Sequence, residues 1–258
     1  MQERKNGFFV RVVIRLKRAI ELSRKGEIFD VLRTGLRIVF VDPFGCLYYK
    51  IFKSGKTFTF QNEPYKYFYH FYNSTWKSER AIEIPIIWRI VKAYEEEKIL
   101  EVGNVLSHYF QVNYDILDKY EKGIGVINED VVDFQPKKKY DLVISISTLE
   151  HVGWDEVPRE SIKIIRAFEN LEKILSAKGK LIVTFPIGYN DELDNFIRNK
   201  KIKLTKMYCL KRTAKDVWKQ VEYDEISDSK HNHPYFAGNS LIVGIIEKEP
   251  LTHEMEFN

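Results

Sequence analysis

The stretch KILEVGNVLSHYFQVNYDILD, residues 98–118, contains two short apolar runs, ILEV and DIL, and a glycine follows the first of them. Runs of this kind form central parallel strands, because both faces of such strands are covered. Similar runs follow at 123–128 (GIGVIN), 140–147 (YDLVISIS) and 180–185 (KLIVTF). Before the last run, residues 158–175 place apolar side chains at helical spacing, namely Ile162, Ile165, Phe168, Leu171 and Ile174. Strands that alternate with helices predict an α/β, doubly wound sheet.

The sequence outside this region differs in character. Residues 1–38 hold ten Lys and Arg against four Asp and Glu, and apolar residues at helical spacing predict a basic amphipathic helix over residues 9–22. Such a helix suits peripheral contact with an anionic membrane, although one packed on its own domain has the same pattern, and we favour that simpler interpretation. Residues 38–72 are rich in aromatic side chains, and a helix is expected around 82–90, capped by Ser74 or Thr75.

The chain end completes the predicted organisation. Residues 207–210 (MYCL) and 240–247 (SLIVGIIE) read as edge strands, and a polar tail follows. We therefore expect an aromatic N-terminal extension at 1–95 that lids or shapes a site, an α/β domain at 96–248 and a tail at 249–258.

Composition excludes several classes of protein. The 258 residues are 44% hydrophobic and 30% charged, which excludes collagen-like, coiled-coil and wholly disordered chains. A net charge of +4 means that basic and acidic residues are nearly balanced, so charge alone does not indicate nucleic-acid binding. Two cysteines, no apolar run near ~18 residues and no signal-peptide core predict a cytoplasmic protein.

Polar residues follow several of the predicted strands. Gly103 follows the first, Asp118 the second, Asp130 the third, and Glu150 and His151 the fourth. The carboxyl ends of strands are where open α/β sheets bind ligands, and a strand–glycine turn suits a nucleotide. Asp118 could accept both hydroxyls of a ribose, and Asp130 could accept a hydrogen bond from an adenine amino group. Each feature alone is more often structural than functional.

Taken together, the order and spacing of these residues are specific. The segment from ILEVG through DILDKYEKGIGVINEDVVDF and YDLVISISTLEHVGWDE to KLIVTFPIGYN resembles class I S-adenosylmethionine-dependent methyltransferases over residues 98–190, with the end strands extending the match to 247. Within that family it is similar to uncharacterised microbial members found with surface-polysaccharide genes. The resemblance implies a Rossmann-like sheet of seven strands, the last of them antiparallel and formed by residues 240–247.

The resemblance also implies site residues. The cofactor-binding residues would be Glu101, Gly103, Asn104, Asp118, Asp130 and Ser147, with Glu101 and Gly103 beside the methionine moiety. His151 and Glu150 would face the reactive sulfonium and the acceptor. His151 is the best placed candidate base, although a histidine that caps the turn is equally consistent.

The sequence departs from the family pattern in two places. Val105 and Ser107 stand where small residues are usual, so Val105 would crowd the methionine arm. The 17 residues from Glu101 to Asp118 are fewer than the ~20 expected, which predicts a first helix of about two turns and a trimmed pocket. A non-catalytic binding or scaffold protein with the same fold is therefore the alternative to an enzyme.

The expected acceptor is a sugar or small hydroxylated metabolite, methylated on oxygen. Trp76, Tyr67, Tyr69 and Tyr72 could stack on sugar rings, although a hydrophobic core explains most of them. Nucleic acid is disfavoured as an acceptor, because no Asn/Asp-Pro-Pro-aromatic motif follows the fourth strand. His231 and His233 lie near acidic residues, but their spacing matches no specific metal site, so no metal is predicted.

Overall fold

The computed structural model describes residues 42–94 and 97–248, and the helix expected at 9–22 lies outside them. The chain divides into two units, Met1–Ser54 and Gly55–Asn258. The described element of the first unit is α3 (Asp42–Phe52). The helices of the second unit are α4 (Arg80–Ala93), α5 (Lys163–Ile174) and α6 (Asp191–Arg198), with 3₁₀ turns η2 (Tyr72–Lys77), η3 (Leu106–His108), η4 (Leu149–His151) and η5 (Tyr223–Glu225).

The strands of the second unit form a hairpin and a large sheet. The hairpin consists of β1 (Thr57–Phe60) and β2 (Glu63–Lys66). The remaining strands are β3 (Ile99–Val102), β4 (Asp115–Leu117), β5 (Val126–Ile127), β6 (Tyr140–Ile146), β7 (Leu175–Phe185), β8 (Lys206–Ala214), β9 (Val217–Val221) and β10 (Ser240–Glu247). Among the described residues they form one sheet in the order β5-β4-β3-β6-β7-β10-β8-β9.

The strand directions confirm the predicted Rossmann-like fold. Strands β5, β4, β3, β6 and β7 are parallel, and β10 is antiparallel to both β7 and β8, as the family resemblance implied. Two details differ from the prediction. The additional strand β9 extends the sheet beyond the expected seven. As a result, β8 and β10, which contain the predicted edge strands 207–210 and 240–247, are both interior strands.

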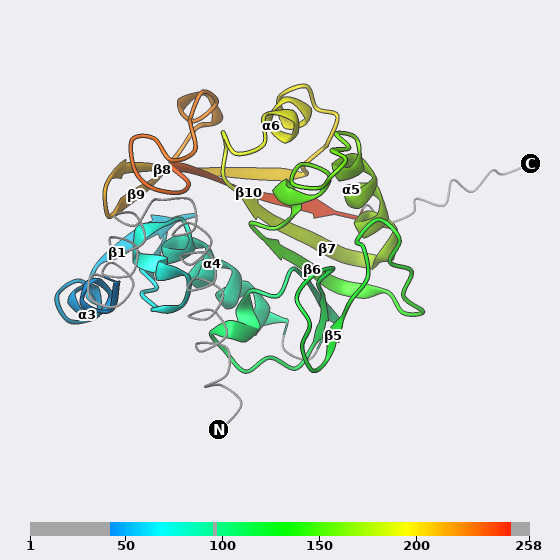
Figure 1. Ribbon diagram of the computed structural model, residues 1–258, viewed down its shortest axis with the longest axis horizontal. Helices are drawn as coiled ribbons and strands as arrows, with labels where there is room; N and C mark the ends of the chain where they lie inside the picture. Colours follow the sequence, from blue (N-terminus) through cyan, green and yellow to red (C-terminus); the bar gives the residue numbers. More distant parts are fainter. Residues whose placement is uncertain (1–41, 95–96, 249–258) are drawn as a thin grey trace, which may run out of the picture. The chain divides into compact units, whose positions relative to one another are not determined.

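Burial on both faces explains why the central runs are continuously apolar. Leu142, Val143 and Ile144 follow one another in β6 and are all completely buried. Val143 belongs to the core that α5 and α6 share with the sheet, which Figure 1 shows as helices near β7 and β10. Alternate residues of a strand point to opposite faces, so Leu142 and Ile144 belong to the other side of the sheet.

Three local predictions differ from the structure. The connection between β3 and β4 is only 12 residues long and contains the single turn η3 instead of a two-turn helix. Helix α4 begins after Glu79, so neither Ser74 nor Thr75 caps it. Helix α5 has the predicted apolar face except that Ile162, its N-cap residue, is 59% exposed.

The aromatic region after Ser54 is mainly structural. Gln61 and Asn62 have φ angles of 50° and 63°, which suit a two-residue hairpin turn between β1 and β2. Trp76, Tyr67 and Tyr69 are buried, while Tyr72 stacks on His108 at 4.3 Å between ring centroids. Within the described ranges, no helix is both long and apolar enough to cross a membrane.

Candidate active site

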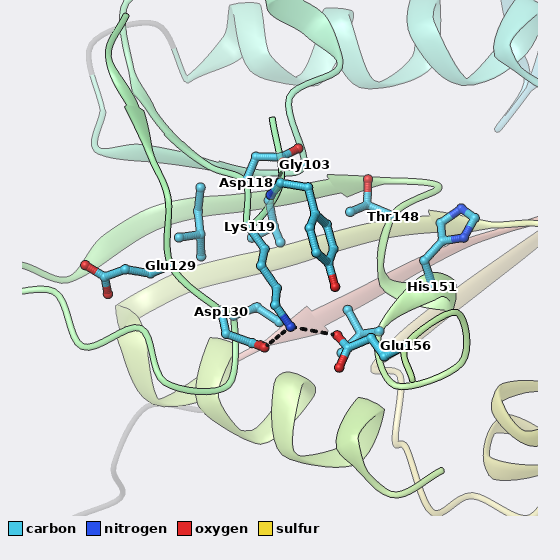
Figure 2. A pocket seen from close by; sticks show the side chains of 13 residues that line it. Gly103, Asp118, Lys119, Glu129, Asp130, Thr148, His151 and Glu156 are labelled. Atoms are coloured by element: carbon cyan, nitrogen blue, oxygen red, sulfur yellow. Dashed lines mark hydrogen bonds and ion pairs between the residues drawn. The ribbon is translucent and has the colours of Figure 1, made fainter. Parts of the chain in front are cut away.

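A pocket lies at the topological switch point of the sheet, where the order of the strands reverses. Strand β3 pairs with β4 on one side and β6 on the other, so the loops that follow these strands diverge and leave a crevice. The pocket has a volume of about 230 Å³. Its lining, drawn in Figure 2, is Val102, Gly103, Leu117, Asp118, Lys119, Tyr120, Glu129, Asp130, Val131, Thr148, His151, Val152 and Glu156. The predicted residues Gly103, Asp118, Asp130 and His151 are thus brought together.

Gly103 forms the turn that ends β3. Its φ of 87° is a left-handed conformation that glycine adopts at low cost. A Cβ at this position would lie 2.2 Å from Thr148 Oγ1, and the Gly103 N–H donates to the Leu117 carbonyl at 2.8 Å. Close packing of the loop after β3 on the loop after β6 therefore requires a glycine at this position, whether or not a ligand is bound. Replacement of Gly103 would disturb this packing as well as the pocket.

Glu101 supports the same loop from behind and does not line the pocket. Its Oε1 accepts the N–H groups of Val105 and Leu106 at 2.9 and 2.8 Å, and its Oε2 accepts the Tyr114 hydroxyl at 3.0 Å. The side chain is fully buried, and this burial raises the pKa of Glu101 to about 7 despite these donors. Glu101 therefore holds the loop in place. Val105 is also buried and is absent from the pocket lining.

Asp118 lies at the end of β4 and organises the loops around it. Its Oδ2 accepts the Asn104 N–H at 3.0 Å, and its Oδ1 accepts the N–H groups of Tyr120 and Glu121 at 2.9 and 2.7 Å. A carboxylate offers about four acceptor positions, so three are used within the protein. Asp118 can accept about one further hydrogen bond without a rearrangement. The side chain of Asn104 donates instead to Glu121.

Asp130 belongs to a cluster of four charges. Its Oδ2 lies 2.8 Å from Lys119 Nζ and 2.6 Å from Lys163 Nζ, and both lysines also contact Glu156, at 3.2 and 2.6 Å. Burial raises the pKa of Asp130, but hydrogen bonds from Lys119 and Lys163 outweigh it and lower the pKa below its usual value. Lys119 crosses the pocket to reach both acids (Figure 2), so it occupies space that a ligand would need.

His151 lies across the pocket from Asp118 and is oriented by an acid. Its Nδ1 lies 2.5 Å from Asp155 Oδ2, and the Tyr189 hydroxyl donates to the same oxygen at 2.7 Å. Burial raises the pKa of Asp155, but the hydrogen bonds from Tyr189 and His151 outweigh this effect. The net pKa is lower than usual, which favours the carboxylate. A carboxylate at Nδ1 holds the proton there and leaves Nε2 with a lone pair. The His151 side chain is 45% exposed, and its Nε2 lies 4.0 Å from Glu150 Oε1.

Glu150 belongs to a buried cluster of charged groups and is absent from the pocket lining, although it approaches the imidazole of His151. It is 2% exposed, and its Oε2 has no hydrogen-bond partner among the described residues. Glu83 of α4 is nearby in the same cluster and accepts the Ser147 hydroxyl at 2.5 Å, while Arg80 Nη1 lies 3.5 Å from Glu83 Oε2. Burial raises the pKa of both glutamates. Ser147 and Glu150 thus support the β6 loop and do not line the pocket.

The sequence did not reveal several residues of the site. Lys119, Thr148, Asp155 and Tyr189 carry no motif, although the spacing of His151 and Asp155 at i and i+4 is a signal that could have identified the pair. His231 comes near the site through Tyr189, with ring centroids 5.1 Å apart. Within residues 42–94 and 97–248, no group of three His, Cys, Asp or Glu side chains is arranged to hold a metal ion.

Comparisons with known proteins give weak structural similarities. No protein-family model and no curated protein matches the chain. The N-methyltransferase NodS from Bradyrhizobium japonicum, in complex with S-adenosyl-L-homocysteine, matches with 12% identity over 66% of this chain and 87% of its own, at a TM-score of 0.44. A 1,6-didemethyltoxoflavin-N1-methyltransferase from Burkholderia thailandensis matches with 12% identity over 65% and 79%, at 0.40. A TehB-like SAM-dependent methyltransferase from Corynebacterium glutamicum matches with 17% identity over 64% and 95%, at 0.36. Similarities at this level identify no activity for this chain.

Proposed function

We propose that the chain is an S-adenosylmethionine-dependent methyltransferase that methylates a hydroxyl group of a sugar or of a small hydroxylated metabolite. The observation that carries this proposal is the composition of one pocket. Gly103, Asp118 and Asp130 lie along it at the ends of β3, β4 and β5, and His151 with its partner Asp155 lies after β6. An acidic group suited to ribose hydroxyls and an oriented base therefore meet at one sheet edge.

The acceptor groups of the pocket fit this cofactor on one condition. Asp118 retains acceptor capacity for a ribose hydroxyl, and Asp130 presents a carboxylate at the adenine end. The volume of about 230 Å³ is below the ~300 to 1,000 Å³ of typical ligand sites, and Lys119 spans the pocket. Lys119 must therefore leave the pocket when the cofactor binds. Lys163 still pairs with Asp130 and Glu156, so neither acid is left without a cation.

The catalytic demand on the protein is small. The cofactor supplies a methyl group on an electrophilic sulfonium, so the protein mainly has to align the acceptor. A hydroxyl acceptor must lose a proton, and His151 Nε2 is the group that takes it. Asp155 keeps Nδ1 protonated and stabilises the imidazolium that forms. Helix α4 supplies Arg80, whose Nη1 donates to the Ile146 carbonyl at 2.9 Å and so fixes the start of the β6 loop.

The Lys119 bridge also favours the alternative, a binding or scaffold protein without turnover. A permanent bridge between Lys119 and the two acids would exclude the adenine. The short turn η3 also replaces the helix that was expected beside the cofactor. Titration calorimetry of the whole chain with S-adenosylmethionine and with its demethylated product distinguishes the two functions. Saturable binding of both supports the enzyme. The absence of heat with either at millimolar concentration would leave the scaffold function in its place.

A further inference from the structure

Helix α3 exposes a continuous row of large apolar side chains. Phe44, Leu47, Tyr48, Ile51 and Phe52 are 67%, 53%, 49%, 57% and 70% exposed, and we call these five residues the α3 apolar face. Their positions i, i+3, i+4, i+7 and i+8 place them on one side of the helix. On the opposite side of the helix, Cys46 is buried and Tyr49 and Lys53 are half-buried. The large apolar side chains of the helix therefore lie on its exposed side.

This concentration of apolar surface differs from the rest of the described chain. Eleven large hydrophobic residues in the described ranges are markedly exposed, and five of them belong to this one helix. The other six, such as Ile124 and Val157, are dispersed along the remaining sequence. Single exposed apolar residues are normal on protein surfaces, whereas a contiguous patch marks a surface that binds something.

The charge of the unit that contains α3 indicates the partner. Residues 1–54 hold twelve Lys and Arg against five Asp and Glu, a net charge of +7, while the whole chain carries +4, so residues 55–258 carry −3. A second copy of this unit would bring like charge against the face. A nucleic acid would suit the charge but not five apolar side chains. An anionic lipid surface suits both properties.

We propose that the α3 apolar face inserts into the surface of an anionic bilayer and holds the protein there peripherally. This inference does not depend on the proposed function. Eleven residues make a helix of about 16 Å, half the ~30 Å hydrocarbon core, so α3 lies in the plane of the interface rather than across it. The rings of Phe44, Tyr48 and Phe52 suit the boundary between headgroups and acyl chains.

Flotation of the full chain with vesicles tests this proposal. Vesicles of phosphatidylcholine alone are compared with vesicles that also contain phosphatidylglycerol, at low and at high salt. The wild type is expected to bind only the anionic vesicles, and less at high salt, because surface charge is screened. Phe44→Gln with Phe52→Gln removes two members of the apolar face and should weaken binding at least tenfold, because interfacial affinity scales with the apolar area inserted.

Ile124→Gln with Val157→Gln is the matched control. Both residues are over nine-tenths exposed but lie outside α3, so this double variant should bind vesicles within twofold of the wild type. Circular dichroism and thermal unfolding of each variant confirm that the fold is kept. Three outcomes would overturn the proposal: no binding of the wild type to anionic vesicles, equal weakening by the control, or a wild-type dimer that the α3 variant converts to monomer without any vesicle binding.

Discussion

The two sides of the pocket are built in different ways. On the β4–β5 side, Asp118, Lys119 and Asp130 lie within 13 consecutive residues and are partly exposed. Lys119 and Asp130 form an ion pair, and Asp118 accepts backbone N–H groups. On the β6–β7 side, Ser147 and Glu150 meet Glu83, which comes from α4 more than sixty residues earlier, and the groups are buried. The first side combines local hydrogen bonds with ion pairs to Lys163 and Glu156, whereas the second consists of buried groups that tertiary packing brings together.

This difference implies a division of roles. Exposed, paired groups can exchange a protein partner for a ligand at little cost, since exposed ion pairs contribute only ~0 to 1 kcal/mol. Buried charges cannot be rearranged cheaply, because removal of one member leaves an uncompensated charge. The β4–β5 side is therefore suited to a cofactor that enters and leaves, and the β6–β7 side to a rigid platform below His151. The following variants test this contrast.

The largest effect is expected from His151→Gln, on the platform side. If Nε2 takes the acceptor proton, kcat should fall by ~10² to 10⁴-fold, the usual contribution of a general base. The affinity for S-adenosylmethionine should stay within a few-fold, measured by calorimetry beside turnover with a panel of hydroxylated acceptors. Tyr189→Phe, which removes one donor to Asp155, is the control and should have a smaller effect. Equal loss of rate and cofactor affinity in His151→Gln would assign the histidine to the cofactor shell.

Glu101 should make the folded protein less stable as the pH rises. Its pKa is about 7 in the folded chain against an ordinary 4.5, so the folded state retains a proton that the unfolded state loses. The contribution of Glu101 to stability is thus complete below pH 4.5 and is lost as the pH approaches 7. The free energy of unfolding should fall over this range by about 3 kcal/mol at most. Glu101→Gln keeps the group neutral and should flatten this fall, measured by urea unfolding across the range. Glu129→Gln, an exposed control, should leave the slope unchanged.

Asp118→Ala should weaken cofactor binding at least tenfold. A ribose hydroxyl loses a charge-assisted hydrogen bond of ~1.5 to 3 kcal/mol. The same substitution leaves the N–H groups of Asn104, Tyr120 and Glu121 without their acceptor, so the melting temperature of the free protein should also fall. Calorimetry and thermal unfolding separate the two effects. Glu129→Gln again serves as the control, because Glu129 lines the pocket but points away from Asp118 in Figure 2. An unchanged cofactor affinity in Asp118→Ala would exclude Asp118 as the ribose ligand.

The sequence predicted those features that depend on residues near one another along the chain. The apolar runs predicted the parallel strands, because continuous burial requires them, and Asp118 and Asp130 follow from the positions where strands end. The family resemblance, not the pattern itself, supplied the antiparallel direction of β10. The role of Glu101 was not visible, since only the fold shows that its carboxylate meets the N–H groups of its own loop.

The features that the sequence could not predict are formed by long-range contacts. Arg80 and Glu83 reach the β6 loop only because α4 packs beside β6, and nothing in their local pattern indicates a partner there. No sequence pattern distinguishes Lys119 from other surface lysines, and only the fold shows that its ammonium contacts Asp130 and Glu156. The two-turn helix expected after Gly103 was wrong for a physical reason: the 12 residues from β3 to β4 must also form the glycine turn and the extended return.

Lys119→Ala should produce the smallest effect, and in the opposite direction. The Lys119 side chain is 37% exposed, and a hydrogen bond to Asp130 raises the pKa of its ammonium, so it is a charged group that bridges the pocket. Breaking such a bridge costs ~0.2 to 1 kcal/mol, so its removal should tighten binding of S-adenosylmethionine by up to about fivefold. Lys122→Ala, an exposed lysine nearby, should change nothing. Calorimetry at two salt concentrations adds a second check, because screening weakens the bridge and should narrow the difference between wild type and variant. Weaker binding by Lys119→Ala would mean instead that the lysine holds the cofactor.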